Sequence, residues 1–327
     1  MKLLANIYFL FLTITLISSF QTNAQDKNYE EWYLKTKDSL DIYIRELGNG
    51  KDTIIVVHGG FGANHTYMLD AIKGLENKYH FVLYDQRGSL LSPANASKLT
   101  FQKNVSDLHQ IVTELKLKKA KIMCHSMGTL VCMEYLKQYP EEVSNLVLVG
   151  SVPAKADTIG GSSIFTDRYN KQVDFMMNRK EVKELKEKYE LKNGDKSTQV
   201  GYYNYNSQLS DKEQTELWRI NFASVNIYKM ANWRLIKGGR GYYKQDATIM
   251  AETVNWTYDY RKILNKNGKV TIIMGDYDFL DFKAENHKEI ISDYKDIDLV
   301  TIPNAGHNIW IDEPELFKTS LTQALDK

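Results

Sequence analysis

Residues 121–138 read KIMCHSMGTLVCMEYLKQ, and this stretch decides the expected fold. Residues 121–124 predict a short buried strand, and residues 129–138, which are followed by Pro140, predict a helix. Between them Ser126 occupies a turn so tight that the position two residues later must be small, and Gly128 fills that position. A serine that joins a strand to a helix in this way is typical of a nucleophile elbow. An ordinary connection, with Ser126 as a helix N-cap, is the structural alternative.

Strands and helices alternate on both sides of this turn. The run of five β-branched residues at 53–57 fits a strand buried on both faces. An amphipathic helix that begins near Asn104 or Ser106 fills one of the connections. Further strands are expected at residues 33–35, 40–45, 81–84, 146–149, 270–274 and 299–302. The repeated strand–helix–strand order predicts an α/β fold, in which a mostly parallel sheet carries helices on both faces.

The alternation stops between residues 151 and 254. Residues 179–191 predict a highly charged amphipathic helix with a solvated face, and residues 202–243 are rich in tyrosine and tryptophan without a strand pattern. We therefore expect an inserted, mostly helical cap over residues 151–254. This leaves residues 25–150 and 255–327 as the α/β core.

Two further motifs follow predicted strands. The sequence HGGFG at residues 58–62 follows the strand at 53–57, and its glycines leave backbone N–H groups free to face a developing oxyanion. Gly60 or Phe61 would supply one N–H group of an oxyanion hole, and Met127 would supply the other. A flexible turn with no chemical role is the alternative.

The second motif is a pair of polar residues near the C-terminus. Asp278 follows the strand at 270–274, and His307 follows the strand at 299–302. The carboxyl ends of parallel strands meet at one edge of a sheet, so both side chains are expected beside Ser126. The chain order Ser126, Asp278, His307 predicts a catalytic triad, although a capping aspartate and a surface histidine would be the structural alternative. Asp276 and Asp281 are rival acids.

The N-terminus predicts a targeting segment. Lys2 precedes an apolar run, and the small residues Thr22 and Ala24, at the first and third positions of a cleavage site, predict cleavage after Ala24. Residues 1–24 are therefore expected to be a cleaved signal peptide that directs the protein to the periplasm or outside the cell. A retained membrane anchor is the alternative, because residues 3–20 are about long enough to span a bilayer.

Charge and composition exclude several classes of protein. Of the 327 residues, 42 are Lys or Arg and 41 are Asp or Glu, a balance that argues against a nucleic-acid partner or a membrane-surface binder. Cys124 and Cys132 are too few for a disulfide framework and are expected to be buried apolar residues. The histidines have no spacing typical of a metal site. The oligomeric state is left open.

The mature chain resembles α/β-hydrolases of the proline iminopeptidase-like group. Besides the motifs above it carries YDQRGS at residues 84–89 and YPEEV at residues 139–143. The resemblance implies an eight-stranded sheet, a helical cap, and no metal or organic cofactor. It also implies that Asp85 and Arg87 order a loop. The chain departs from the group at Phe61, where proline is usual, and at residues 124, 125 and 127, where glycine, glycine and tryptophan are usual.

The resemblance implies serine-dependent removal of an N-terminal residue, often proline, from a small peptide. Such enzymes bind the substrate ammonium with a carboxylate of the cap, for which Glu216 is the candidate, and Trp218, just after it, is expected to bind substrate as well. Glu213 is expected to face solvent. We therefore expect a secreted serine aminopeptidase. An esterase, lactonase or carbon–carbon-bond hydrolase with the same triad is the alternative, and a non-catalytic binding protein on this fold is a third.

Overall fold

The computed structural model describes residues 29–156, 164–193, 209–237 and 244–327. The predicted signal peptide at residues 1–24 lies outside these ranges, as do three short segments of the predicted cap. Within the described ranges, no helix combines the length and the apolar character needed to cross a membrane.

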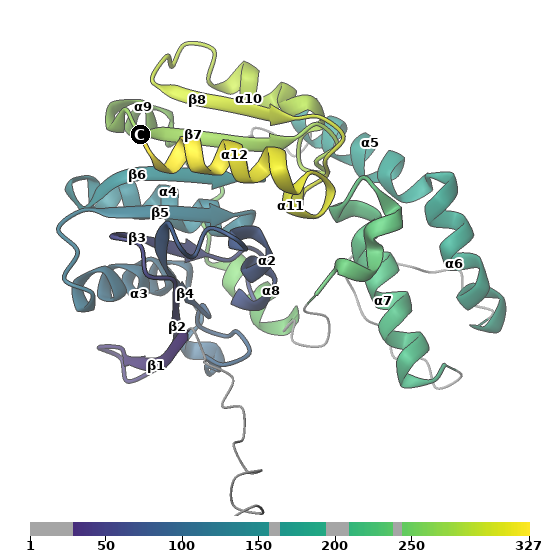
Figure 1. Cartoon of the computed structure of the whole chain (residues 1–327), viewed down its shortest axis with the longest axis horizontal. Coiled ribbons are helices and arrows are strands. Elements are labelled where there is room, and N and C mark those ends of the chain that lie inside the picture. Colours follow the sequence, from purple (N-terminus) through teal and green to yellow (C-terminus); the bar gives the residue numbers. More distant parts are fainter. Residues whose placement is uncertain (1–28, 157–163, 194–208, 238–243) are drawn as a thin grey trace, which may run out of the picture.

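Eight strands form one sheet in the order β1-β2-β4-β3-β5-β6-β7-β8 (Figure 1). The strands are β1 (Tyr29–Lys35), β2 (Asp41–Leu47), β3 (Asp52–Val57), β4 (Tyr79–Tyr84), β5 (Ala120–His125), β6 (Val143–Val149), β7 (Val270–Gly275) and β8 (Ile297–Ile302). β2 pairs antiparallel with both β1 and β4, and every pair from β4 to β8 is parallel. The predicted α/β class and the eight-stranded, mostly parallel sheet are confirmed.

Helices cover both faces of the sheet because its central strands are apolar on both faces. Along β3, Ile55 and Val57 belong to one buried cluster, whereas Ile54 and Val56 belong to another. The first cluster includes side chains of α3 (Phe101–Glu114), α4 (Met127–Gln138), α9 (Arg261–Asn267) and α10 (Glu285–Ile290). The second includes side chains of α2 (Met68–Ile72), α11 (Ile309–Asp312) and α12 (Pro314–Leu325). Figure 1 shows α12 in front of the sheet and α3 behind it.

One helix begins earlier than expected. α3 begins at Phe101, with Thr100 as its N-cap, and not near Asn104 or Ser106. Thr100 has extended backbone angles, and its hydroxyl accepts a hydrogen bond from the N–H group of Lys103 at 3.3 Å. The Asn104 side chain instead donates to Gln86 Oε1 at 2.9 Å, so it is used for a tertiary contact.

A helical segment separates β6 from β7, and we call residues 151–254 the helical insertion. Its elements are α5 (Ile164–Asn178), α6 (Lys180–Asn193), α7 (Asp211–Asn226), the 3-10 helix η4 (Met230–Leu235) and α8 (Lys244–Glu252). In Figure 1, α5, α6 and α7 lie on the side toward which the arrowheads of β5 to β8 point. The insertion therefore lies at the carboxyl ends of the parallel strands. The remaining short 3-10 helices are η1 (His65–Tyr67), η2 (Ala96–Lys98), η3 (Pro140–Glu142) and η5 (Phe282–Ala284).

Asp85 joins the loops that follow β3 and β4. Its Oδ1 accepts hydrogen bonds from the backbone N–H and from Nδ1 of His65, both at 2.8 Å, and its Oδ2 accepts one from the Leu91 N–H group at 2.9 Å. Burial alone would raise the pKa of Asp85, but the bonds from His65 lower it overall. The carboxylate therefore orders both loops next to the ends of the central strands.

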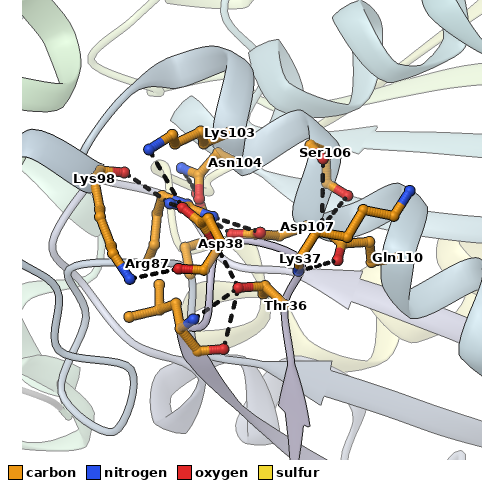
Figure 2. Close-up of polar contacts among 12 residues, drawn as sticks. Thr36, Lys37, Asp38, Arg87, Lys98, Lys103, Asn104, Ser106, Asp107 and Gln110 are labelled. Atoms are coloured by element: carbon orange, nitrogen blue, oxygen red, sulfur yellow. Dashed lines mark hydrogen bonds and ion pairs between the residues drawn. The ribbon is translucent and has the colours of Figure 1, made fainter.

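Arg87 holds the same region to α3 and to the turn between β1 and β2 (Figure 2). Its guanidinium makes a two-pronged contact with Asp107, at 2.8 and 2.7 Å, and also donates to the carbonyl of Lys98 at 2.7 Å and to Asp38 at 3.1 Å. The Arg87 and Asp107 side chains are 1% and 0% exposed. This buried ion pair fixes the loop that begins after β4.

Replacing Asp107 with alanine should strongly destabilise the fold, because it leaves the Arg87 charge buried with only part of its compensation. Removing one partner of a buried pair costs about 3–5 kcal/mol, and urea unfolding at neutral pH would measure the loss. Lys103 also contacts Asp38, at 3.3 Å, but its side chain is 38% exposed. The control Lys103→Ala should therefore cost less than about 1 kcal/mol. Equal losses in the two variants would contradict the structural role of the Arg87–Asp107 pair.

Candidate active site

Ser126 lies on the sharp turn between β5 and α4. Its backbone has φ +54° and ψ −129°, a conformation that costs a non-glycine residue about 1–3 kcal/mol. The turn is held by the Ser126 N–H group, which donates to the Val149 carbonyl at 3.0 Å, and by Thr129, whose N–H donates to the Ser126 carbonyl at 2.9 Å. Ser126 occupies the N-cap position of α4, but its side chain makes no capping hydrogen bond there.

Glycines allow the loop after β3 to pack directly against this turn. A Cβ atom on Gly128 would lie 2.4 Å from the carbonyl oxygen of His58, and one on Gly59 would lie 2.5 Å from the Cβ atom of Ser126. Both distances are shorter than any normal carbon contact. The small residue that the sequence requires at position 128 is therefore explained by backbone crowding, and the HGGFG segment lies beside Ser126.

Asp278 and His307 form a buried pair at the ends of β7 and β8. Nδ1 of His307 lies 3.0 and 2.9 Å from the two carboxylate oxygens of Asp278, and both side chains are almost fully buried. Since a carboxylate can only accept, Nδ1 carries the proton and Nε2 is left as the acceptor. Of the rival acids, Asp281 is bound to His287 Nδ1 at 2.6 Å, and Asp276 makes no side-chain contact with His307.

His307 lies next to His125, the residue that precedes Ser126 in the chain. The rings of His307 and His125 have centroids 4.5 Å apart, and a Cβ atom on Gly150 would lie only 2.9 Å from the His307 ring. Among the described residues, no hydrogen bond joins the Ser126 hydroxyl to His307. Bonds of this kind are often long until a substrate is bound.

Three backbone N–H groups near Ser126 have no acceptor. Those of Gly60, Phe61 and Met127 donate to no residue that the structure describes. Met127 is the first residue of α4, where a backbone N–H group has no acceptor within the helix. Gly60 has φ +51°, a conformation that a glycine adopts without strain and that turns the loop at this position. The arrangement leaves donors where the sequence predicted an oxyanion hole.

The order of the sheet, with these side chains at its carboxyl edge, agrees with a comparison of sequence families. The family model described as "alpha/beta hydrolase fold" matches residues 52–161. The chain has the α/β-hydrolase fold.

The known proteins that are similar to this chain carry the names of different activities. A proline iminopeptidase, PfmaB from Pestalotiopsis fici, is 24% identical over 283 residues, which cover 84% of this chain and 92% of that protein. A proline iminopeptidase-related protein from Thermus thermophilus has a crystal structure that aligns with TM-score 0.60 and 17% identity over 91% of this chain and 97% of that one. An esterase from Exiguobacterium antarcticum aligns with TM-score 0.59 and 17% identity over 91% and 100%. The chain thus resembles proline iminopeptidases, but its fold is shared with esterases.

The two residues of the predicted cap that were expected to bind substrate make other contacts. The Tyr189 hydroxyl donates to Glu216 Oε2 at 2.5 Å, and Trp218 is buried and stacks on Phe222 with ring centroids 5.2 Å apart. The C-terminal end of α7, at Asn226, is the part that touches the loop of His307. Glu216 lies ten residues earlier, or roughly 15 Å along the helix axis. The structure does not bring Glu216 or Trp218 to Ser126.

Asp312 connects the helical insertion to the loop of His307, and nothing in the sequence marks it. The buried carboxylate accepts hydrogen bonds from the N–H groups of Gly306 at 2.8 Å, Tyr228 at 2.7 Å and Lys229 at 2.8 Å. Burial raises the pKa of Asp312, although these three bonds oppose the shift. The residue before His307 and the segment of the insertion between α7 and η4 therefore bind the same carboxylate.

Arg179 completes this connection from the other side. Its guanidinium donates to the backbone carbonyls of Ser224 at 3.1 Å and Ile227 at 3.0 Å, and also to that of Tyr228. In addition, the Asn308 N–H donates to the Asn226 carbonyl at 2.8 Å. The backbone between α7 and η4 is thus held by an anion on one side and a cation on the other.

Alanine at position 312 should destabilise the protein by about 3 kcal/mol, because three N–H groups lose a buried charged acceptor. The side chain of the adjacent Glu313 accepts a hydrogen bond from the Lys229 ammonium at 2.6 Å and from no other described residue, and it is 22% exposed. The control Glu313→Ala should cost less than about 1 kcal/mol. Urea denaturation of both variants measures the difference, and similar midpoints would refute the proposed role of Asp312.

Proposed function

We propose that this protein is a serine hydrolase in which Ser126 attacks the carbonyl carbon of an ester or amide. The observation that carries the proposal is the placement of Ser126 at φ +54° on the β5–α4 turn, beside a buried Asp278–His307 pair with its Nε2 free. A strained serine on a strand-to-helix turn lowers the stability of the fold, and such strain is found mainly at functional sites. Proximity of an oriented imidazole supplies the base that a serine requires.

The reaction follows from this arrangement. His307 Nε2 takes the Ser126 proton as the hydroxyl oxygen bonds to the carbonyl carbon, and the carbonyl oxygen becomes an oxyanion. The N–H groups of Met127 and of Gly60 or Phe61 stabilise that charge, each by about 3 kcal/mol in enzymes of this type. The carbon–leaving-group bond then breaks, and the imidazolium of His307 protonates the departing alcohol or amine. Water repeats the sequence and releases the acid.

The substrate that the residues favour is an ester or amide with an apolar group near the scissile bond. The Phe279 ring lies edge-on to the His307 ring, with centroids 4.7 Å apart, and also contacts Tyr169 of α5 at 6.1 Å. An ammonium group would need a carboxylate close by. No carboxylate is buried among the insertion side chains that the structure describes. We propose that the helical insertion acts as a cap over this apolar side of the site.

An aminopeptidase is the second candidate, and Asp246 is the observation that favours it. A Cβ atom on Gly88, in the YDQRGS segment, would lie 3.3 Å from the Cβ atom of Asp246 on α8. Asp246 is half-buried, and this partial loss of hydration raises the pKa of its carboxyl, with no hydrogen bond from the described residues to oppose the shift. A substrate ammonium would provide the missing partner. The overall likeness to a proline iminopeptidase supports the same activity.

A paired assay on residues 25–327 tests these proposals, with Ser126→Ala as the blank. One substrate is an aryl butyrate ester, and the other is a prolyl arylamide offered with a free and with an acetylated amine. Ester cleavage with no arylamide cleavage would support the first proposal. Arylamide cleavage that disappears on acetylation, and that Asp246→Asn weakens through KM, would support the second. We further propose that the protein acts after export, as its residues 1–24 predict.

A further inference from the structure

A continuous chain of hydrogen bonds passes behind Ser126. The N–H group of Gly59 donates to the Tyr67 hydroxyl oxygen at 2.5 Å, and this hydroxyl lies 2.9 Å from Nδ1 of His125. On the far side of the same ring, Nε2 of His125 lies 3.2 Å from the backbone carbonyl of His307. The chain therefore begins in the loop after β3 and ends at the residue that would act as the base.

The direction of every bond in this chain is fixed by its two ends. An amide N–H can only donate and a carbonyl can only accept, so Nε2 of His125 must carry the proton that binds His307. Nδ1 is then an acceptor, and the Tyr67 hydroxyl donates to it while accepting from Gly59. This pattern requires a neutral imidazole. Burial lowers the pKa of His125 well below its usual value, and the neighbouring His307 lowers it further.

Aromatic packing holds the two side chains in place. The Tyr67 ring stacks on Trp310, with centroids 6.1 Å apart, and the His125 ring meets the same indole edge-on at 4.9 Å. His125 is 2% exposed and Trp310 is 5% exposed. The aromatic contacts with Trp310 therefore restrict the positions of both polar side chains.

We propose that Tyr67 and His125 are positioning residues that hold the loop of residues 58–62 and the base His307 in place relative to Ser126. The proposal rests on the serine-hydrolase function above. Because Tyr67 binds the Gly59 N–H group, it fixes the peptide between His58 and Gly59, one residue before Gly60, and leaves the N–H groups of Gly60 and Phe61 for the substrate. The same tyrosine reaches His307 through His125. Misplacement of such a site by about 1 Å can cost 10²-fold in rate.

Tyr67→Phe is the decisive variant, because it keeps the stack on Trp310 and removes only the hydroxyl. We expect kcat to fall by about 30-fold with KM unchanged within about twofold, since oxyanion contacts strengthen only in the transition state. A trifluoromethyl ketone, which forms a tetrahedral adduct with the serine, should bind about 30-fold more weakly. Tyr79→Phe is the matched control. Its hydroxyl binds Asp326 at 2.7 Å at the opposite end of the sheet, so its kcat should stay at the wild-type value.

A second pair of variants tests the link through His125. Glutamine at position 125 retains a donor and an acceptor, whereas leucine retains neither. We expect His125→Gln to keep at least about tenfold more of the wild-type kcat than His125→Leu, with thermal unfolding used to confirm that both are folded. This pair decides the matter if Tyr67→Phe does not fold.

The outcomes separate this inference from the proposed function. If Tyr67→Phe and Tyr79→Phe have the same kcat, or if Tyr67→Phe changes only KM, the positioning role is wrong. In that case an inactive Ser126→Ala variant would leave the serine-hydrolase proposal intact. An active Ser126→Ala variant would overturn the function itself, whatever the tyrosine variants show. Equal kcat values for the two His125 variants would remove His125 from the chain.

Discussion

Alanine in place of Ser126 is expected to lower kcat by about 10⁶-fold while the protein stays folded. In the proposed mechanism the Ser126 hydroxyl forms the acyl intermediate, and no neighbouring side chain would substitute for it. The backbone strain at φ +54° is about the same for alanine as for serine, so the substitution should change stability little. The ester assay proposed above measures the loss, with reaction progress followed over hours to reach the low residual rate.

Ser144→Ala is a suitable control for this variant. Ser144 also lies at a strand of the central sheet, and its hydroxyl donates to the Ala120 carbonyl at 3.1 Å, away from the site. Its kcat should equal that of the wild type. Covalent labelling with a fluorophosphonate provides a second readout, because the reagent should add to the wild type and to Ser144→Ala but not to Ser126→Ala. Labelling of all three proteins would show that another residue is the nucleophile.

Asparagine at position 278 is expected to lower kcat by about 10⁴-fold with little change in KM. The amide has nearly the same shape as the carboxylate, but its NH₂ group favours the imidazole tautomer in which Nδ1 accepts and Nε2 is protonated. A protonated Nε2 cannot take the Ser126 proton. The amide also lacks the charge that stabilises the imidazolium. The loss should shrink at high pH if hydroxide replaces the missing base.

Asp276→Asn is the matched control, since it makes the same chemical change two residues earlier. Asp276 is half-buried, and its backbone alone is bonded, with its N–H donating to the Ile302 carbonyl at 2.9 Å. The activity of this variant should be close to that of the wild type. A greater loss of activity in Asp276→Asn than in Asp278→Asn would show that Asp276, and not Asp278, orients the imidazole.

The sequence predicts well those features that depend on neighbours along the chain. The β-branched run at 53–57 predicts β3 to within one residue, and residues 121–138 predict the turn at Ser126. The pairing of Asp278 with His307 also follows from sequence, because each directly follows a strand of a parallel sheet. Parallel strands bring their carboxyl ends together whatever their order, so the strand order itself was not needed for this prediction.

The remaining features depend on contacts between distant segments. Tyr67 and His125 are 58 residues apart, and Gly306 meets Tyr228 only through Asp312. None of these residues belongs to a pattern that marks its partner. Glu216 was chosen for its charge and for its place before Trp218, but the axial rise of α7 separates it from the site. The helix start at Phe101 was missed because Asn104, a good cap by residue type, is used by Gln86.

The contact between the insertion and the His307 loop also limits how the insertion can be replaced in engineered chimeras. A chimera that replaces residues 151–254 with the corresponding segment of another hydrolase would break the bonds of Asp312 to Tyr228 and Lys229, and that of Asn308 to Asn226. The loss of these bonds would then displace the loop that carries His307. A chimera designed to change specificity should therefore exchange residues 151–254 and 304–313 together, although 49 residues of the core separate the two segments in the chain.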